Sequence, residues 1–103
     1  MDEKRLRGLM GLSTRAGQGL FGADKIEKAI RAGNCGVLIL DGGISAASRE
    51  RYEGLCAREG IPAAVSRPGL IAEATGKPGA AMGVRPGALA EQMAECLRET
   101  AKE

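Results

Sequence analysis

The residues best suited to binding chemistry lie in the stretch Gly22–Gly33, directly after a glycine-rich turn over 17–19. Lys28 and Arg31 fall on the side of a predicted helix opposite its apolar residues, with Lys25 on their flank. A helix start offers free backbone N–H groups and a partial positive charge, which suit a phosphate group. Glycines beside it would let a nucleic-acid backbone approach closely. The pattern indicates a phosphate-binding helix end, and the alternative is a solvated helix face after a tight turn.

Side chains that carry out catalysis are sparse in this sequence. Histidine, the commonest general base, is absent. Ser45 and Ser48 have neither a partnering base nor an SxxK spacing, and clusters of metal ligands are missing. We therefore expect no catalytic residue, no metal and no cofactor, and interpret the protein as a non-enzyme.

One pattern favours a nucleotide-binding enzyme instead. Residues 17–22 match GxGxxG, and Asp41 follows the next predicted strand at roughly the position of a ribose-binding acid. That fingerprint must follow a strand, whereas residues 2–16 have a helical pattern. The chain is also too short for two nucleotide-binding halves. A glycine turn between a helix and a strand explains these residues more simply, and protection from thermal melting by NAD or ATP would test the alternative.

Length and composition limit the fold and the partner. The 103 residues are predicted to form a single domain over 1–103. Its core must be aliphatic, because Phe21 and Tyr52 are the only aromatic residues. The net charge is only +2, but the segment from Lys4 to Arg31 holds seven basic and two acidic residues. This uneven distribution indicates an anionic partner.

The cysteines and the hydropathy pattern bear on the compartment. Cys35, Cys56 and Cys96 are far apart and form no CxxC pair, and their odd number indicates free thiols in a reducing cytoplasm. No secretory hydrophobic region opens the chain, and no apolar run approaches transmembrane length. We expect a cytoplasmic protein without a membrane partner.

Helical and strand patterns alternate along the chain. Val37–Leu40 is a continuous apolar run typical of a buried strand. Ser45 is a suitable N-cap for the helix that follows, and Pro86 lies where the last helix can begin. The predicted helices cover 2–16, 23–32, 45–59, 68–75 and a stretch after 86, and the predicted strands cover 20–21, 37–40, 61–65 and 80–84. This alternation predicts an α/β sandwich.

Further candidate residues lie outside the basic helix. Arg15 and Gln18 flank the same glycine turn and could contact phosphate or sugar. Arg67 and Lys77, at the two ends of the fourth predicted helix, would complete a basic rim if the fold brought them beside that turn. Ordinary exposed cations are the alternative. Phe21 is either a ring that stacks on a base or, as we favour, a core residue.

Several segments together resemble one protein family. They occur in a familiar order and spacing over nearly the whole chain, although no single motif is decisive. The segments are Leu9–Gly17, Gly22, Lys28–Gly33, Leu38–Leu40 with the turn 41–45, Ala74–Lys77, and Val84 with Gly87–Ala90. The chain resembles the kink-turn-binding ribosomal proteins, also called the ribosomal L-seven-Ae family, and within it the small bacterial YlxQ-type branch.

This resemblance implies a three-layer α/β/α sandwich with a small mixed four-stranded sheet. It also implies binding of kinked, non-canonical RNA helices without catalysis. In the family, a Gly-Ala-Asn-Glu turn opens a helix that docks on tandem sheared G·A pairs, and a lysine further along that helix contacts RNA. Here Gly22, Ala23 and Lys28 match that pattern, whereas Asp24 replaces the asparagine and Lys25 replaces the glutamate.

The two replacements change the chemistry of the turn. A glutamate accepts hydrogen bonds from guanine N–H groups, whereas Lys25 can only donate and would meet guanine O6 or N7, or a phosphate. Asp24 can accept but not donate. The loop after Gly76 is also shorter than in the kink-turn binders, where it contacts a flipped-out nucleotide. The resemblance carries that contact over to Gly76 and Lys77, and general RNA binding carries over better than strict kink-turn recognition.

These observations predict a cytoplasmic RNA-binding protein whose partner is structured RNA, including ribosomal RNA as a candidate. The predicted RNA-binding residues are Arg15, Gln18, Gly22, Ala23, Asp24, Lys25, Lys28, Arg31, Gly76 and Lys77. The alternative is a protein-interaction module of the same fold without strong RNA binding. The sequence leaves the oligomeric state open.

Overall fold

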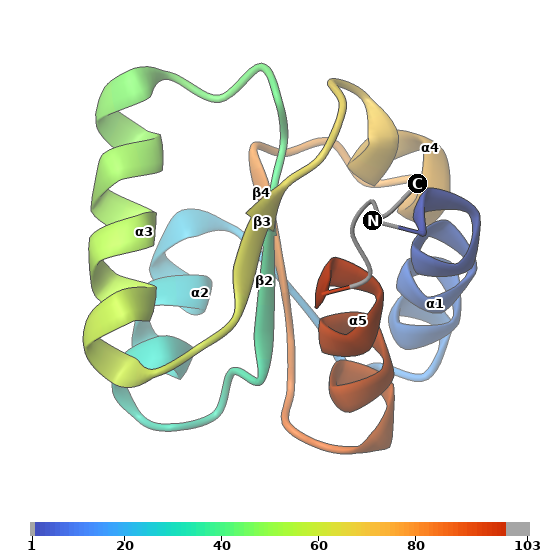
Figure 1. The fold of residues 1–103 in the computed structure, drawn as a ribbon, viewed down its shortest axis with the longest axis horizontal. Helices are drawn as coiled ribbons and strands as arrows, with labels where there is room; N and C mark the ends of the chain where they lie inside the picture. The colour runs from blue at the N-terminus through green and yellow to red at the C-terminus, as the bar shows by residue number, and fades with distance from the viewer. Residues whose placement is uncertain (1, 99–103) are drawn as a thin grey trace.

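A computed structural model describes residues 2–98. Its elements form three layers, with α2 and α3 on one face of a sheet and α1, α4 and α5 on the other (Figure 1). The helices are α1 (Glu3–Arg15), α2 (Ala23–Arg31), α3 (Ala46–Glu59), α4 (Leu70–Thr75) and α5 (Ala88–Arg98). The strands are β1 (Gly19–Phe21), β2 (Val37–Leu40), β3 (Ala63–Val65) and β4 (Ala81–Val84). The predicted α/β/α sandwich is confirmed.

The sheet is mixed and four-stranded, as predicted, and its strands lie in the order β1-β4-β2-β3. Strand β4 runs antiparallel to both β1 and β2, and Gly83 pairs with Leu20 on one side and Leu38 on the other. Strand β3 lies parallel to β2, because α3 carries the chain back along the sheet between them. Strands far apart in the sequence are therefore neighbours at the centre.

Alternating side chains of β2 divide the core into two halves. Val37 and Ile39 pack with Leu6 and Met93 beneath the helices α1 and α5, whereas Leu38 and its neighbours pack beneath α2 and α3. This follows from the strand period of two, which sends successive residues to opposite faces. All four residues of β2 are buried, in agreement with the prediction of a buried strand.

The ends of the elements differ from prediction by a few residues. Strand β3 starts at Ala63 and not at Ile61, because the Ile61 N–H closes the end of α3 by bonding the Cys56 carbonyl oxygen at 2.9 Å. Helix α4 starts at Leu70 because Gly69, with φ of 89°, is left-handed and cannot belong to the helix. Ser45 caps α3 as expected, accepting a hydrogen bond from the Ser48 N–H at 3.2 Å. The predicted continuation of the last apolar stripe to Thr100 lies outside the described residues.

Two further expectations concern the cysteines and the membrane. Cys35 and Cys56 are free, buried thiols, as predicted, and Cys96 is buried as well. Among the described residues, no helix combines the length and the apolar character needed to cross a membrane.

Candidate nucleic-acid interface

The start of α2 follows β1 directly and is open. Gly22 occupies the N-cap position with φ of 97°, a backbone conformation that favours glycine. No side chain caps this helix start, so its first N–H groups face outward from the end of the helix. A Cβ atom built on Gly22 would meet nothing within 4 Å, so the space directly beside this residue is open.

Helix α2 separates its apolar and basic sides as the sequence predicted. Ile26 and Ile30 are buried against the sheet and α3. Lys25, Lys28 and Arg31 are exposed. At 1.5 Å of rise per residue, Lys25 and Arg31 are separated by about 9 Å along the helix axis. Lys25, the third residue of the helix, therefore lies near Gly22, whereas Lys28 lies with Arg31 in the last turn.

The loop 76–80 lies beside this helix start, although more than fifty residues separate them in sequence. A cavity of about 210 Å³ lies between them, lined by Gly22, Ala23, Ile26 and Tyr52 on one side and by residues 78–81 on the other. The Lys77 Nζ atom lies 5.4 Å from the centroid of the Phe21 ring. The structure thus brings Lys77 and residues 78–81 to the turn that opens α2, a placement of Lys77 that the sequence analysis made conditional on the fold.

The Phe21 side chain lies between Lys77 and the core. Its ring is half-buried and packs against the core cluster that α1 and α5 cover. The Lys77 ammonium over the ring makes a cation–π contact. Phe21 thus packs against the core with part of its ring, and Lys77 lies over that ring.

Arg15 and Gln18 lie at the opposite end of β1 from Gly22, so they flank the turn 17–19 and not the start of α2, and their contact with RNA stays a prediction. Gly19 pairs with Val84, whereas Phe21 pairs with Met82. The Gln18 carbonyl oxygen accepts a hydrogen bond from the Arg85 N–H at 3.0 Å, which places Gln18 where β4 ends. A three-residue strand separates the two turns by about 10 Å. Arg31 is also distant from the turn, since it ends α2.

Arg67 does not join the basic rim. Its guanidinium forms ion pairs with Glu3 (Nε to Oε2, 2.8 Å) and Glu73 (Nη2 to Oε1, 2.5 Å). Hydrogen bonds to Glu3 and Glu73 raise the pKa of Arg67. The residue joins α1 to α4 on the other face of the sheet from α2.

Tyr52 lines the cavity. Sequence reasoning gave this residue no role beyond the core. It is 4% exposed, and the Arg51 guanidinium carbon lies 5.8 Å from its ring centroid. Arg51 in turn pairs with Glu27 of α2 at 2.8 Å. Burial, followed by the negative charge of Glu27, raises the pKa of Tyr52. No local sequence signal marks this role, because it arises from the packing of α3 against α2.

The GxGxxG segment has a structural explanation. It runs from the end of α1 through a turn into β1, the reverse of the strand-to-helix context that a dinucleotide needs. The Asp41 carboxylate accepts hydrogen bonds from the Gly43 and Gly69 N–H groups, each at 2.8 Å, and so ties two loops together. Within residues 2–98, no group of three acidic, cysteine or histidine side chains is placed to hold a metal ion.

Comparison with known proteins supports the fold. No protein-family model matches this chain, and no curated protein matches it. A solved structure of a protein of unknown function from Bacillus halodurans superposes with a TM-score of 0.86 and 25% sequence identity, over 92% of this chain and 98% of that one. The archaeal translation termination factor aRF1 superposes with a TM-score of 0.58 and 15% identity, over 74% of this chain and 22% of that chain. The second likeness shows a shared fold alone.

Proposed function

We propose that this chain is a non-catalytic, cytoplasmic RNA-binding protein of the kink-turn-binding ribosomal family, recognising structured RNA through the start of α2 and the loop 76–80. The observation that carries the proposal is the meeting of these two segments around an open, uncapped helix start. Exposed lysines lie on both segments: Lys25 and Lys28 on α2, and Lys77 on the loop.

The chemistry of this surface suits an RNA backbone. The N–H groups at the start of α2 would donate to a phosphate, and the helix dipole favours the negative charge there. Lys25 and Lys28 add two positive charges, and Gly22 presents no Cβ to keep the sugar-phosphate chain at a distance. These groups would position the RNA without reading its sequence.

Base recognition falls to Asp24 and the cavity. The Asp24 side chain is exposed in the first turn of α2. Its carboxylate can accept hydrogen bonds from guanine or cytosine N–H groups. The cavity between Gly22, Tyr52 and residues 78–81 is also lined by Ala23, which precedes Asp24 in the chain, so an unpaired nucleotide could enter it.

A binding assay with a salt series tests this proposal. We expect a gel-shift panel to show binding to kinked RNA in preference to plain duplex RNA and DNA. With about four phosphate contacts, the slope of log K against log salt should be near −3. Lys28→Ala should reduce its magnitude by about one unit, because one counterion-releasing contact is lost.

Arg58→Ala is the matched control for Lys28→Ala. Arg58 is exposed in the last turn of α3, away from the helix start, and its loss should leave the slope unchanged. If the two variants change the slope equally, Lys28 is not part of the site. If the protein binds none of the three nucleic acids at low salt, the alternative of a protein-interaction module is favoured.

A further inference from the structure

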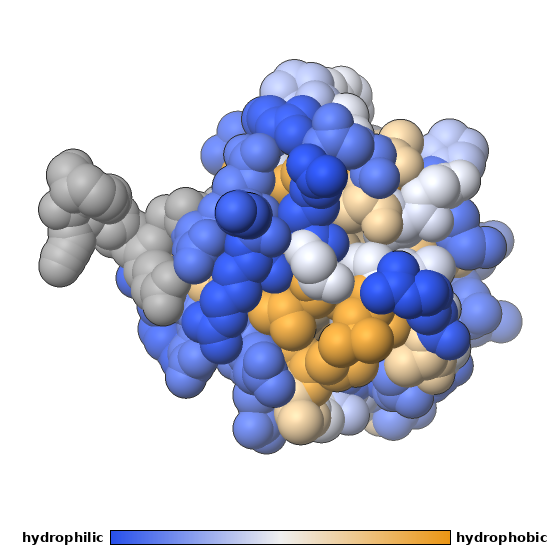
Figure 2. Space-filling model, turned by 90° about the vertical axis from the view of Figure 1, so that its right-hand side faces the viewer, coloured by the Kyte–Doolittle hydropathy of each residue, from blue (hydrophilic) through white to orange (hydrophobic). Residues whose placement is uncertain are grey.

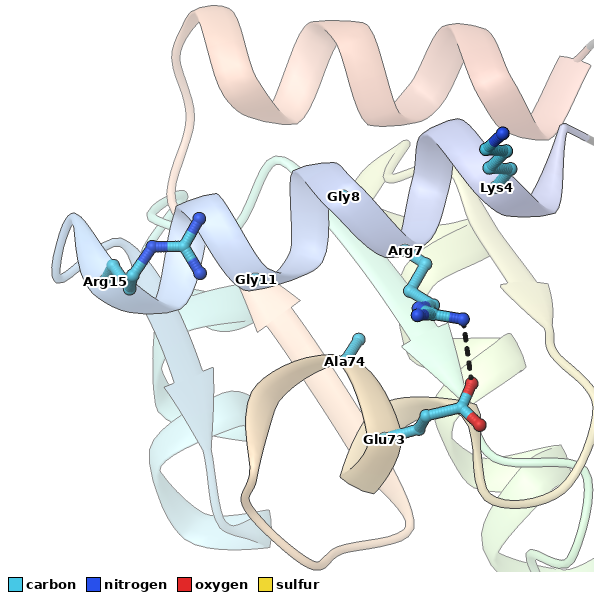
Figure 3. Close-up of a pocket in the computed structure, with 7 residues that line it drawn as sticks. All are labelled: Lys4, Arg7, Gly8, Gly11, Arg15, Glu73 and Ala74. Atoms are coloured by element: carbon cyan, nitrogen blue, oxygen red, sulfur yellow. Dashed lines mark hydrogen bonds and ion pairs between the residues drawn. The ribbon is translucent and has the colours of Figure 1, made fainter.

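We propose that the groove between α1 and α4 is a docking site for an acidic, amphipathic helix of a partner protein. The groove has a volume of about 510 Å³. Its α1 side carries Lys4, Arg7 and Arg15 with Gly8 and Gly11 between them, and its α4 side carries Glu73 (Figure 3). It lies on the opposite face of the sheet from α2 and is separate from the proposed RNA surface.

The groove has an excess of positive charge. Glu73 already bonds Arg7 at 3.4 Å and Arg67 at 2.5 Å, so its carboxylate is occupied. Neither Lys4 nor Arg15 forms an ion pair with a carboxylate of residues 2–98. Two cations along one side of α1 therefore remain available for carboxylates from outside.

The floor of the groove admits another helix. Gly11 is explained by the fold, since a Cβ there would lie 3.1 Å from the Ala74 carbonyl oxygen of α4. Gly8 has no such explanation: a Cβ there would meet nothing within 4 Å, yet glycine weakens a helix interior. The bare backbone at Gly8, next to the charged side chains, leaves room for the close approach of a second helix.

An apolar surface beside the charges favours a protein over RNA. Leu12, one turn after Gly8, is 45% exposed and is the one large hydrophobic side chain found exposed among residues 2–98. Figure 2 shows an apolar area on this side of the molecule, bordered by hydrophilic side chains. A phosphate chain would gain nothing from Leu12. A helix with acidic residues next to leucines satisfies both features.

Fluorescence anisotropy with a defined probe tests the site. The probe is a labelled 16-residue helical peptide with glutamate at every fourth position and leucine immediately before each glutamate. We expect saturable binding with Kd on the order of 10 μM, which weakens as salt is raised. The double variant Lys4→Glu with Arg15→Glu should bind about tenfold more weakly, because it replaces attraction by repulsion.

A second pair of variants separates blocking of the groove from a general effect of substitution. Gly8→Gln should weaken peptide binding by about fivefold or more, because its side chain fills the floor. Gly54→Gln is the matched control, since Gly54 also lies in a helix with open space around its Cβ position. It should bind the peptide like the unmodified protein.

Three results would overturn the proposal. They are no saturable binding of the probe below about 1 mM, equal binding of a probe with lysine in place of glutamate, and displacement of the probe by kinked RNA. Lys28→Ala, which tests the RNA surface, should leave peptide affinity unchanged, so failure of one proposal is distinguishable from failure of the other.

Discussion

Burial of thiols is the clearest chemical feature at the scale of single residues. Cys56 is 2% exposed, and burial raises the pKa of its thiol from 9.0 to about 11. Burial also raises the pKa of Cys35. These cysteines thus behave as small apolar core residues and not as nucleophiles.

The raised pKa of Cys56 predicts a loss of stability in alkali. Between pH 9 and 11 the unfolded chain ionises this thiol while the folded chain keeps it neutral, so unfolding releases a proton and stability falls as pH rises. We expect the free energy of unfolding to fall by about 2 kcal/mol more in the unmodified protein than in Cys56→Ala by pH 11. Urea unfolding at pH 8 and pH 11 measures the difference, and equal falls in the two proteins would refute it.

For single residues, the sequence predicted whether a side chain is exposed more readily than which distant residue it contacts. The exposure of Lys25 and Lys28 followed from their spacing relative to Ile26 and Ile30. The partner of Arg67 did not, because Glu3 is 64 residues away and only the packing of α1 on α4 brings the two together. A side chain whose role depends on its own helix is predictable, whereas one whose role depends on a distant element is not.

At the scale of elements, helix α1 contains two glycines, Gly8 and Gly11, whose surroundings differ. Gly11 lies against the Ala74 backbone, and its lack of a side chain lets α4 approach. Gly8 lies in open space on the same helix. The sequence suggested only that small residues in this helix allow close packing.

Replacement of glycine by alanine should therefore create a close contact at Gly11 but not at Gly8. Gly8→Ala should raise the free energy of unfolding by about 0.5–1 kcal/mol through helix propensity alone. Gly11→Ala gains the same propensity but places a Cβ atom 3.1 Å from the Ala74 oxygen and 3.3 Å from Arg15 Nη1. It should therefore be less stable than Gly8→Ala by about 1 kcal/mol. Urea denaturation followed by circular dichroism compares them, and equal stabilities would show that α4 yields to the methyl group.

Strand β1 explains why the turn 17–19 and the start of α2 lie apart in space although they are close in the sequence. The turn 17–19 and the turn at Gly22 are close in sequence, and the pattern around them treated both as one surface. The strand between them is short but fully extended, and its pairing with β4 sets Gln18 and Gly22 at opposite ends. Sequence proximity across a strand is therefore a poor guide to proximity in space.

At the scale of the whole molecule, the two central strands hold the fold together. Every residue of β2 and β4 is buried, whereas the edge strand β3 has an exposed residue and two half-buried ones. Each central strand also has a hydrogen-bonded neighbour on both sides. The apolar run 37–40 made β2 predictable, but the place of β4 between β1 and β2 is a property of the topology that no local pattern contains.

This arrangement predicts a gradient of protection in native-state hydrogen exchange. Amides of β2 and β4 should exchange only through global unfolding, and those of β1 and β3 through smaller openings with a free energy lower by about 1–3 kcal/mol. Exchange followed by NMR provides the measurement. Protection of β3 as strong as that of β4 would contradict the gradient.

The place of β4 also governs when the molecule can become complete during its synthesis. Strands β1 and β2 are not hydrogen-bonded to each other. Strand β4, which comes late in the sequence, lies between them. A nascent polypeptide that stops before Ala81 can pair β2 with β3 but leaves β1 without a partner. The turn at Gly22 and the loop 76–80 consequently meet only after the segment through β4 has been translated. The surface proposed to bind RNA is therefore assembled only once β4 has been synthesised and paired with β1.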